Sequence, residues 1–239
     1  MQDLTSAFAL ACDPQLAAEI RRRIDAKTKP LGALGRIEDL AARIAALQGT
    51  TEPRMETCAL TIFAADHGIA AQGVSAFPQA VTVQMALNFL AGGAAANVFA
   101  RSVGAELQVV DAGIAEAIAH PALLDRRMGP GTKDSSLEPA MDEATLARAL
   151  AAGREIAAAS DADALAFGEM GIANTAAASL VIHKLSGLGL DLLTGRGTGL
   201  DDEGLSRKLA VLERAAARTG ALSPAQALAE YGGFEIVTM

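Results

Sequence analysis

The sequence predicts an α/β protein with a parallel, Rossmann-like sheet flanked by helices, together with a smaller helical domain. Three observations predict this class. Short apolar runs alternate with segments of helical periodicity through most of the 239 residues, which is the order of elements in parallel sheets. Hydrophobic residues make up 51% of the chain and charged residues 20%, so a sizeable core can form and wholesale disorder is excluded. The apolar runs also end in polar or charged loops, where parallel sheets bind ligands.

The first elements expected are two amphipathic helices, over 14–26 and 36–48, because apolar residues recur there every three or four positions. A segment with proline and two glycines separates them, and the polar stretch 48–56 is typical of a connector. We therefore assign residues 1–50 to the helical part of the small domain and residues 51–239 to an α/β substrate-binding domain.

Strands and further helices are expected after this connector. The four apolar runs predicted to form strands are 58–65, 106–113, 163–171 and 190–199. The helical patterns that follow are at 79–101, 142–159, 174–186 and 201–218, with a polar stretch at 119–141. Because the carboxyl ends of parallel strands share one edge of a sheet, we expect the four polar loops to converge on one crevice.

Charge and composition exclude several classes of protein. Twenty Lys and Arg against 28 Asp and Glu give a formal charge of −8, which leaves no basic face for nucleic acid. Cys12 and Cys58 are far apart, so neither a disulfide framework nor a zinc ribbon is expected. The segment after Met1 lacks the pattern of a signal sequence, and the Ala-rich runs are weakly hydrophobic for a membrane span. A soluble, cytoplasmic protein is the expectation.

The stretch GEMGIANT (168–175) lies between an expected strand and an expected helix. Gly171 would permit a tight turn, and Asn174 or Thr175 would cap the helix while its free N–H groups face a phosphate or carboxylate. An ordinary strand-to-helix turn uses the same residue types, so composition alone leaves both interpretations open. Glu169 beside an anion-binding loop favours a substrate site, because its charge is costly there unless it serves a substrate group.

A second glycine-rich loop, TGRGTGLDDEG (194–204), precedes the last expected helix. It is neither a Walker sequence nor a complete GxGxxG, although its glycines indicate a close backbone approach to a ligand. Asp201 or Asp202 is expected to cap the helix, on which Lys208 follows, and Arg196 offers a second cation. Taken alone the nucleotide signal is weak, since a solvated lysine is more common.

The stretch 65–85 contains Asp66 and His67, a pair typical of a metal or acid–base site. The other histidines have no partner at ligand spacing, so we expect no metal and no cofactor. Ser75 and Phe77 offer a hydroxyl and an aromatic ring suited to a flat ligand; simple packing of Phe77 in its loop is the alternative.

Together these stretches resemble the nicotinate-nucleotide:dimethylbenzimidazole phosphoribosyltransferase family of cobalamin lower-ligand synthesis. The resemblance runs through most of the chain, over TKPLGALGRIEDLA (28–41), ADHGIAAQGVSAFPQAVTVQM (65–85), NFLAGGAAANVFAR (88–101), VVDAGI (109–114), EPAM (138–141), GEMGIANT (168–175), GRGTGLDDEGL (195–205) and YGGFEI (231–236). It implies a parallel sheet, a smaller helical domain built from both chain ends, and a homodimer.

The resemblance also implies a reaction. Phosphoribose moves from nicotinate mononucleotide to 5,6-dimethylbenzimidazole, giving nicotinate and α-ribazole 5′-phosphate without a metal. The pyridinium leaving group is already positively charged, so the protein must orient the substrates and remove the benzimidazole proton with a carboxylate. The partners implied are these two small molecules, with no nucleic acid and no membrane.

The resemblance assigns site residues by position. Those expected to bind substrates are Ser75, Phe77 and Gln84 in the benzimidazole pocket, Glu169, Gly171, Asn174 and Thr175 around the mononucleotide, and Gly197, Gly199 and Lys208 toward the phosphate. One departure is Ala173, where the family usually has glycine; its methyl group would crowd a bound phosphate.

The family's catalytic glutamate lies in a GEGTGA-like loop beyond GGFEI, and the 239 residues contain no matching position. Glu169 is therefore the candidate catalytic carboxylate of this sequence. The alternative function is a truncated, non-catalytic nucleotide-binding homologue. A generic dinucleotide-binding protein is disfavoured because a complete GxGxxG is missing.

Overall fold

A computed structural model describes residues 13–239, which form two compact units divided between Glu56 and Thr57. The first unit is helical and the second contains the sheet, with the division six residues beyond the predicted boundary at 50/51. The assignment of the helical unit to a small domain stays a prediction. Cys12 and the segment after Met1 lie outside the described residues.

Two helices make up the described part of the first unit, and both were predicted. Helix α2 spans Pro14–Asp25 and helix α3 spans Arg36–Leu47. The Asp13 side chain accepts a hydrogen bond from the backbone N–H of Gln15, which satisfies one free donor at the start of α2. Lys29 in the connection forms a 2.9 Å ion pair with the buried Glu38 of α3. This pair fastens the connecting loop to the second helix.

The second unit is built on a sheet of four parallel strands in the order β3-β2-β1-β4. The strands are β1 Cys58–Ala65, β2 Glu106–Gly113, β3 Leu123–Asp125 and β4 Ala164–Met170. Three of the four predicted strands are therefore confirmed. Both β1 and β2 become fully buried toward their carboxyl ends, which is typical of a parallel sheet covered on both faces.

The prediction of a fourth strand over 190–199 is wrong. Its apolar half forms the short helix α8, Leu190–Leu193, and the glycine-rich half is a loop. Leu190 packs into a cluster of helical side chains, so the hydrophobicity of this run reflects a helical core. The fourth strand of the sheet is β3, which has only three residues inside the polar stretch 119–141 and thus lacks an apolar pattern.

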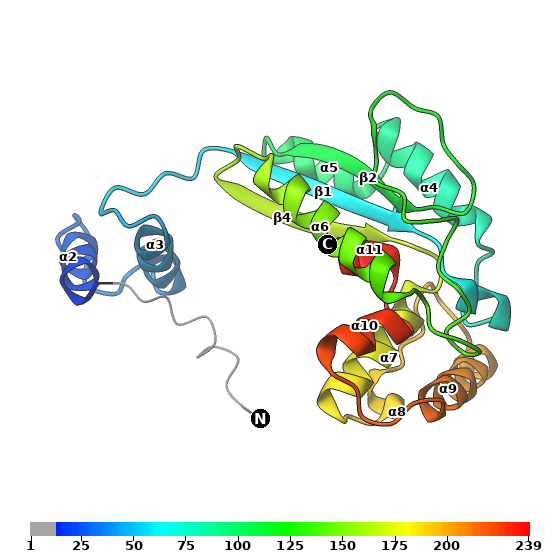
Figure 1. Cartoon of the computed structure of the whole chain (residues 1–239). Helices are drawn as coiled ribbons and strands as arrows, with labels where there is room; N and C mark the ends of the chain where they lie inside the picture. The colour runs from blue at the N-terminus through cyan, green and yellow to red at the C-terminus, as the bar shows by residue number, and fades with distance from the viewer. Residues whose placement is uncertain (1–12) are drawn as a thin grey trace. The chain divides into compact units, whose positions relative to one another are not determined.

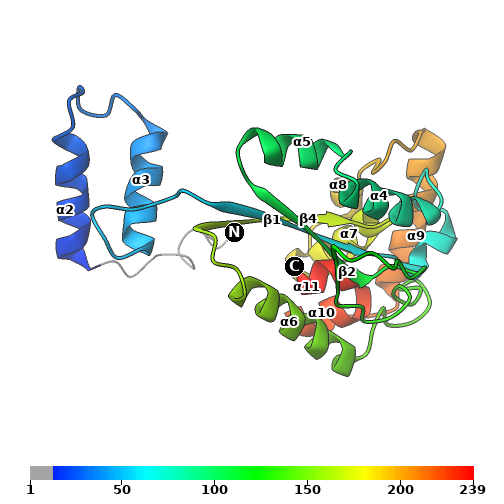
Figure 2. The same cartoon turned by 90° about the horizontal axis from the view of Figure 1, so that it is seen from above.

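Helices cover the two faces of the sheet (Figures 1 and 2). Helices α4 Ala80–Leu90 and α5 Ala95–Ser102 lie on one face, and α6 Glu143–Ala158 and α11 Phe234–Thr238 lie on the other. The predicted helix at 79–101 is two helices because the chain turns at Gly92, whose φ of +77° suits glycine. No helix had been predicted at 234–238.

The segment 80–102 corrects one expectation, because by length and hydropathy it is apolar enough to cross a membrane. It consists of α4 and α5, and α4 contacts β1, β2 and β4. Its hydrophobicity therefore serves in part to cover the sheet.

A separate helical core is formed by α7 Asn174–Ser186, α8, α9 Asp202–Ala217 and α10 Pro224–Tyr231, together with the 3₁₀ turn Gly68–Gln72 that follows β1. Leu180, Leu212 and Tyr231 are fully buried in it. This core supports the loops that follow β1 and β4, where the predicted site residues lie (Figure 1).

Candidate functional site

The carboxyl end of β1 places two ionisable side chains in the interior. Asp66 and His67 are each 1% exposed. One Asp66 oxygen accepts a 2.8 Å hydrogen bond from the backbone N–H of Ala115, and burial raises the pKa of this carboxyl group. Asp66 thus ties the end of β1 to the segment after β2.

The carboxyl end of β2 is shaped by Asp111. Its Oδ1 accepts hydrogen bonds from the backbone N–H groups of Gly113 (2.9 Å) and Ile114 (2.8 Å), and its other oxygen lies 3.4 Å from the Arg127 guanidinium. Burial raises the pKa of the Asp111 carboxyl group, although these hydrogen bonds and the Arg127 charge act to lower it. These partners give Asp111 a structural role in the strand end.

Glu169 lies on β4, in register with Phe63 of β1, and its side chain is open to solvent. The pKa of its carboxyl group is raised, first by partial desolvation and second by the negative charge of Glu235. A raised pKa makes the ionised carboxylate a stronger base, which suits an acceptor of a substrate proton.

Gly171 follows β4 at a position that is too close to other atoms for a side chain. A Cβ there would overlap the carbonyl oxygen of Ala65 and lie 3.1 Å from His67 Nε2. The predicted tight turn is present, and the reason for glycine is this close approach of β4 to the end of β1.

We expect Gly171→Ala to destabilise the protein by about 1–3 kcal/mol, because the overlapping atom is backbone and the strand must move. Urea unfolding followed by circular dichroism measures the change. Gly220→Ala is the matched control, since a Cβ at Gly220 meets nothing within 4 Å. Equal stability of the two variants would contradict the steric argument.

The start of α7 differs from the expected cap. The residue before the helix is Ala173, with φ of +78°, and neither Asn174 nor Thr175 caps the helix with its side chain. Ala173 is the one non-glycine residue with positive φ in the described range. Glycine adopts this conformation without strain, so the backbone alone favours glycine at this position.

Lys208 joins the two glycine-rich loops. Its side chain is 1% exposed, and Nζ donates to Thr175 Oγ1 at 2.8 Å and to the carbonyl of Gly195 at 3.1 Å. A Cβ at Gly197 would lie 3.2 Å from Thr175 Oγ1 and 3.5 Å from Lys208 Nζ. The structure therefore brings Thr175, Gly197 and Lys208 together, and the alternative of a solvated lysine is wrong.

The other residues around this loop are engaged locally. Asp201 caps α9 as predicted, accepting from the backbone N–H of Gly204 at 2.8 Å. Arg196 is exposed and forms an ion pair with Asp202, so it is no free second cation. Gly199 has φ of +110°, which favours glycine in this turn.

The residues expected to hold the benzimidazole lie near the same loop. Ser75 Oγ is 3.4 Å from Thr198 Oγ1, which links the loop after β1 to the second glycine loop. Phe77 is 50% exposed, so loop packing does not account for its ring. Gln84 is an exposed residue of α4. Within the described residues, no hydrogen bond or ion pair joins Phe77 or Gln84 to Thr175, Gly197 or Lys208.

The sequence analysis did not identify Glu235 as a residue of the site. This residue of α11 is fully buried, and its Oε1 lies 2.7 Å from His67 Nε2. The two residues are 168 positions apart, so local spacing could not pair them. The signal available was the stretch YGGFEI, in which an acid follows two glycines inside an apolar segment.

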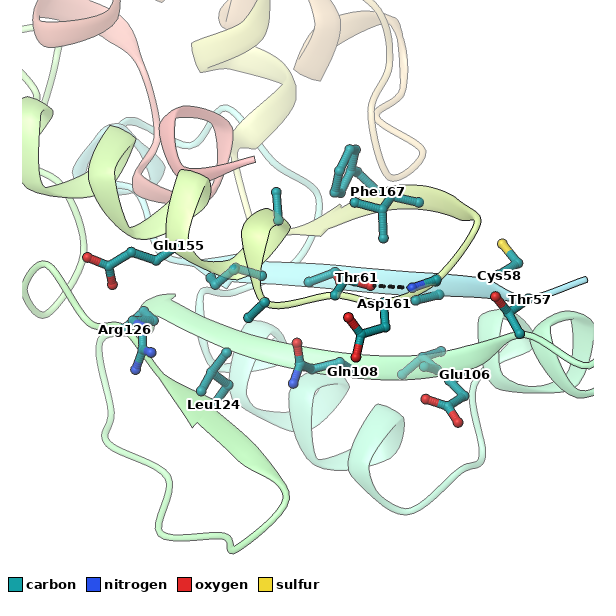
Figure 3. Close-up of a pocket in the computed structure, with 18 of the residues that line it drawn as sticks. Thr57, Cys58, Thr61, Glu106, Gln108, Leu124, Arg126, Glu155, Asp161 and Phe167 are labelled. Carbon is teal, nitrogen blue, oxygen red and sulfur yellow. Dashed lines mark hydrogen bonds between the residues drawn. The ribbon is translucent and has the colours of Figure 1, made fainter. Parts of the chain in front are cut away.

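A cavity of about 780 Å³ lies elsewhere on the sheet. Figure 3 shows its lining, which includes Thr61 of β1, Gln108 of β2, Phe167 of β4 and the end of α6. None of the predicted site residues lines this cavity. We place the candidate site at the carboxyl ends of the strands because the glycine loops and the buried lysine are there.

The family comparison places this fold and site in a phosphoribosyltransferase family. A parallel sheet carries glycine-rich loops at its carboxyl edge, and a buried lysine joins them. The family model that matches residues 10–239 has the description "Phosphoribosyltransferase".

The particular family follows from the relatives. A nicotinate-nucleotide:dimethylbenzimidazole phosphoribosyltransferase from Ralstonia nicotianae is 51% identical over 95% of this chain and 66% of its own length. One from Aromatoleum aromaticum is 52% identical over 97% of this chain and 69% of its own. The crystal structure of CobT from Thermus thermophilus superposes with a TM-score of 0.89 at 46% identity, covering 94% of this chain and 69% of that one. The chain belongs to the nicotinate-nucleotide:dimethylbenzimidazole phosphoribosyltransferase family, and it spans about two thirds of the length of these relatives.

Proposed function

We propose that the protein transfers phosphoribose from nicotinate mononucleotide to 5,6-dimethylbenzimidazole during assembly of the cobalamin nucleotide loop, in the cytoplasm. A benzimidazole nitrogen bonds to the ribose carbon as the bond to the pyridinium nitrogen breaks, and nicotinate leaves with that electron pair. The proton on the other benzimidazole nitrogen passes to a carboxylate, for which Glu169 is the candidate. The products are α-ribazole 5′-phosphate and nicotinate.

The buried ammonium group of Lys208 carries this proposal. Removing a charge from water costs several kcal/mol unless an opposite charge accompanies it. Burial lowers the pKa of Lys208, and no carboxylate lies within ion-pair distance of Nζ in the part of the chain that is described. The phosphate of a mononucleotide would supply the missing negative charge, between α7 and the second glycine loop.

The test is the substitution Lys208→Met, which keeps an unbranched side chain and removes the charge. We expect nicotinate mononucleotide to bind roughly 10- to 100-fold more weakly, because a charge-assisted hydrogen bond contributes about 1.5–3 kcal/mol. Nicotinate, which has no phosphate, should bind with unchanged affinity. Calorimetry measures both.

Arg207→Ala is the matched control, since Arg207 precedes Lys208 on α9 and is exposed. Equal losses for the two ligands in Lys208→Met would contradict a phosphate site at this lysine. Transfer is measured separately, by release of nicotinate in the presence of 5,6-dimethylbenzimidazole. Binding without transfer by the unmodified protein would instead support the non-catalytic homologue.

The proposal extends to the base pocket and to assembly. Ser75, Phe77 and Gln84 are proposed to bind the benzimidazole, and the exposed ring of Phe77 is available to stack on it. A homodimer is also proposed. Its support is the exposed apolar side chains of Val98, Phe99 and Val103 on and beside α5, since such patches favour protein contacts.

A further inference from the structure

The buried pair of His67 and Glu235 has no part in the mechanism described above. His67 lies between β1 and the 3₁₀ turn after it, and Glu235 lies on α11. Their side chains are 1% and 0% exposed, and the distance from Nε2 to Oε1 is 2.7 Å. The pair joins the carboxyl end of β1 to an element far along the chain.

Two glycines enclose this pair. A Cβ at Gly233, just before α11, would overlap His67 Cε1 and both carboxylate oxygens of Glu235. A Cβ at Gly171 would crowd His67 Nε2. The imidazole therefore contacts the turn of GEMGIANT on one side and the start of α11 on the other, so its position and that of Gly171 depend on each other.

The charges around the imidazole are all negative. Glu235 of α11, Asp66 beside His67, and Glu169 of β4 are the titratable groups that face it. Burial alone would lower the pKa of His67, but these carboxylates, Glu235 above all, raise it. Glu235 Oε2 is buried with no hydrogen-bond partner among residues 13–239. The imidazole thus provides the one polar contact of the Glu235 side chain in this range.

We propose that His67 and Glu235 are positioning residues, whose buried hydrogen bond holds the Gly171 turn and Glu169 in the geometry that binds the mononucleotide. The inference rests on the proposed function, because it concerns the same substrate. Glu169 is two residues before Gly171 on the chain, so displacement of the imidazole moves both the loop and the candidate base.

The test compares two substitutions at one position. Glu235→Gln keeps an oxygen that accepts the hydrogen bond from Nε2, whereas Glu235→Ala removes the acceptor. If the Gly171 turn is displaced, the ligand loses about one hydrogen bond to the loop. We therefore expect Glu235→Ala to bind nicotinate mononucleotide about 10-fold more weakly and Glu235→Gln to restore most of the affinity. Thermal melting by circular dichroism shows that both variants are folded at the temperature of the calorimetry.

A second measurement reports directly on the hydrogen bond between His67 and Glu235. The chain has three histidines, so the imidazole nitrogens can be followed by NMR, with His120 and His183 as internal references. We expect His67 in the unmodified protein to remain protonated above its ordinary pKa of 6.5, and this shift to be lost in Glu235→Gln. Titration of His67 with the same pKa in the unmodified protein and in Glu235→Gln would overturn the proposal, because the imidazole would then not contact this carboxylate.

The binding outcomes separate the two proposals. If the unmodified protein does not bind nicotinate mononucleotide, the proposed function fails and the positioning role fails with it. If the unmodified protein binds and Glu235→Ala binds equally well, the positioning role alone is overturned. Equal losses in the Ala and Gln variants would likewise overturn it, because the hydrogen bond would then have no effect.

Discussion

Glu169→Gln is expected to lower the rate of phosphoribosyl transfer by roughly 10²–10⁴-fold, the contribution of a well-placed general base. The amide keeps the size of the side chain and removes its ability to accept a proton. Binding of nicotinate mononucleotide should weaken far less than the rate falls, since Lys208 and the glycine loops are unchanged. Steady-state release of nicotinate measures kcat, and calorimetry measures the affinity.

The pH dependence of the reaction provides a second test of Glu169 as the base. Desolvation and the charge of Glu235 raise the pKa of Glu169 above its ordinary value of 4.5. A protonated Glu169 cannot act as the base, so kcat/KM should fall as the pH is lowered through this raised pKa. Glu106→Gln is the matched control. Glu106 is an exposed glutamate at the amino end of strand β2, whereas Glu169 lies near the carboxyl end of β4. An unchanged rate in Glu169→Gln would assign the base to another residue.

The sheet could be predicted where an apolar run is long enough to form a pattern. Strands β1, β2 and β4 each combine an apolar run with a polar loop, and this pattern is local. The run 190–199 has the same local pattern but packs among helices, and β3 is too short to have a pattern. The first error arises because hydrophobicity shows that a segment is buried and not which element it packs against.

The candidate site could also be predicted only in part. Lys208, Gly197 and Thr175 were predicted by position, and their contacts with one another come from the structure. The role of Asp66 and His67 was unresolved because residue spacing compares only neighbours along the chain. Their environment is completed by Glu235, which reaches His67 only after α11 folds back against the sheet.

Tyr231→Ala is expected to destabilise the protein by about 3–5 kcal/mol, a large part of the roughly 5–15 kcal/mol typical of a domain. Tyr231 is fully buried among α7, α9 and α10. Its hydroxyl donates to the carbonyl of Ala215 at 2.8 Å and is hydrogen-bonded to Thr219 Oγ1 at 2.8 Å. The alanine would leave a cavity and remove the hydrogen bonds that hold α10, and hence α11 with Glu235, against α9.

Two further variants separate these contributions in urea unfolding followed by circular dichroism. Tyr231→Phe keeps the ring and removes the hydroxyl, so the loss should be about 1–3 kcal/mol, the cost of an unsatisfied buried partner. Leu137→Ala removes a side chain that is 72% exposed, outside the apolar patch of α5, and its effect should stay within about 0.5 kcal/mol. If Tyr231→Ala were no more destabilising than Leu137→Ala, the α9–α10 core would not hold the C-terminal helices, and the position of Glu235 would have to depend on its contacts with the sheet alone.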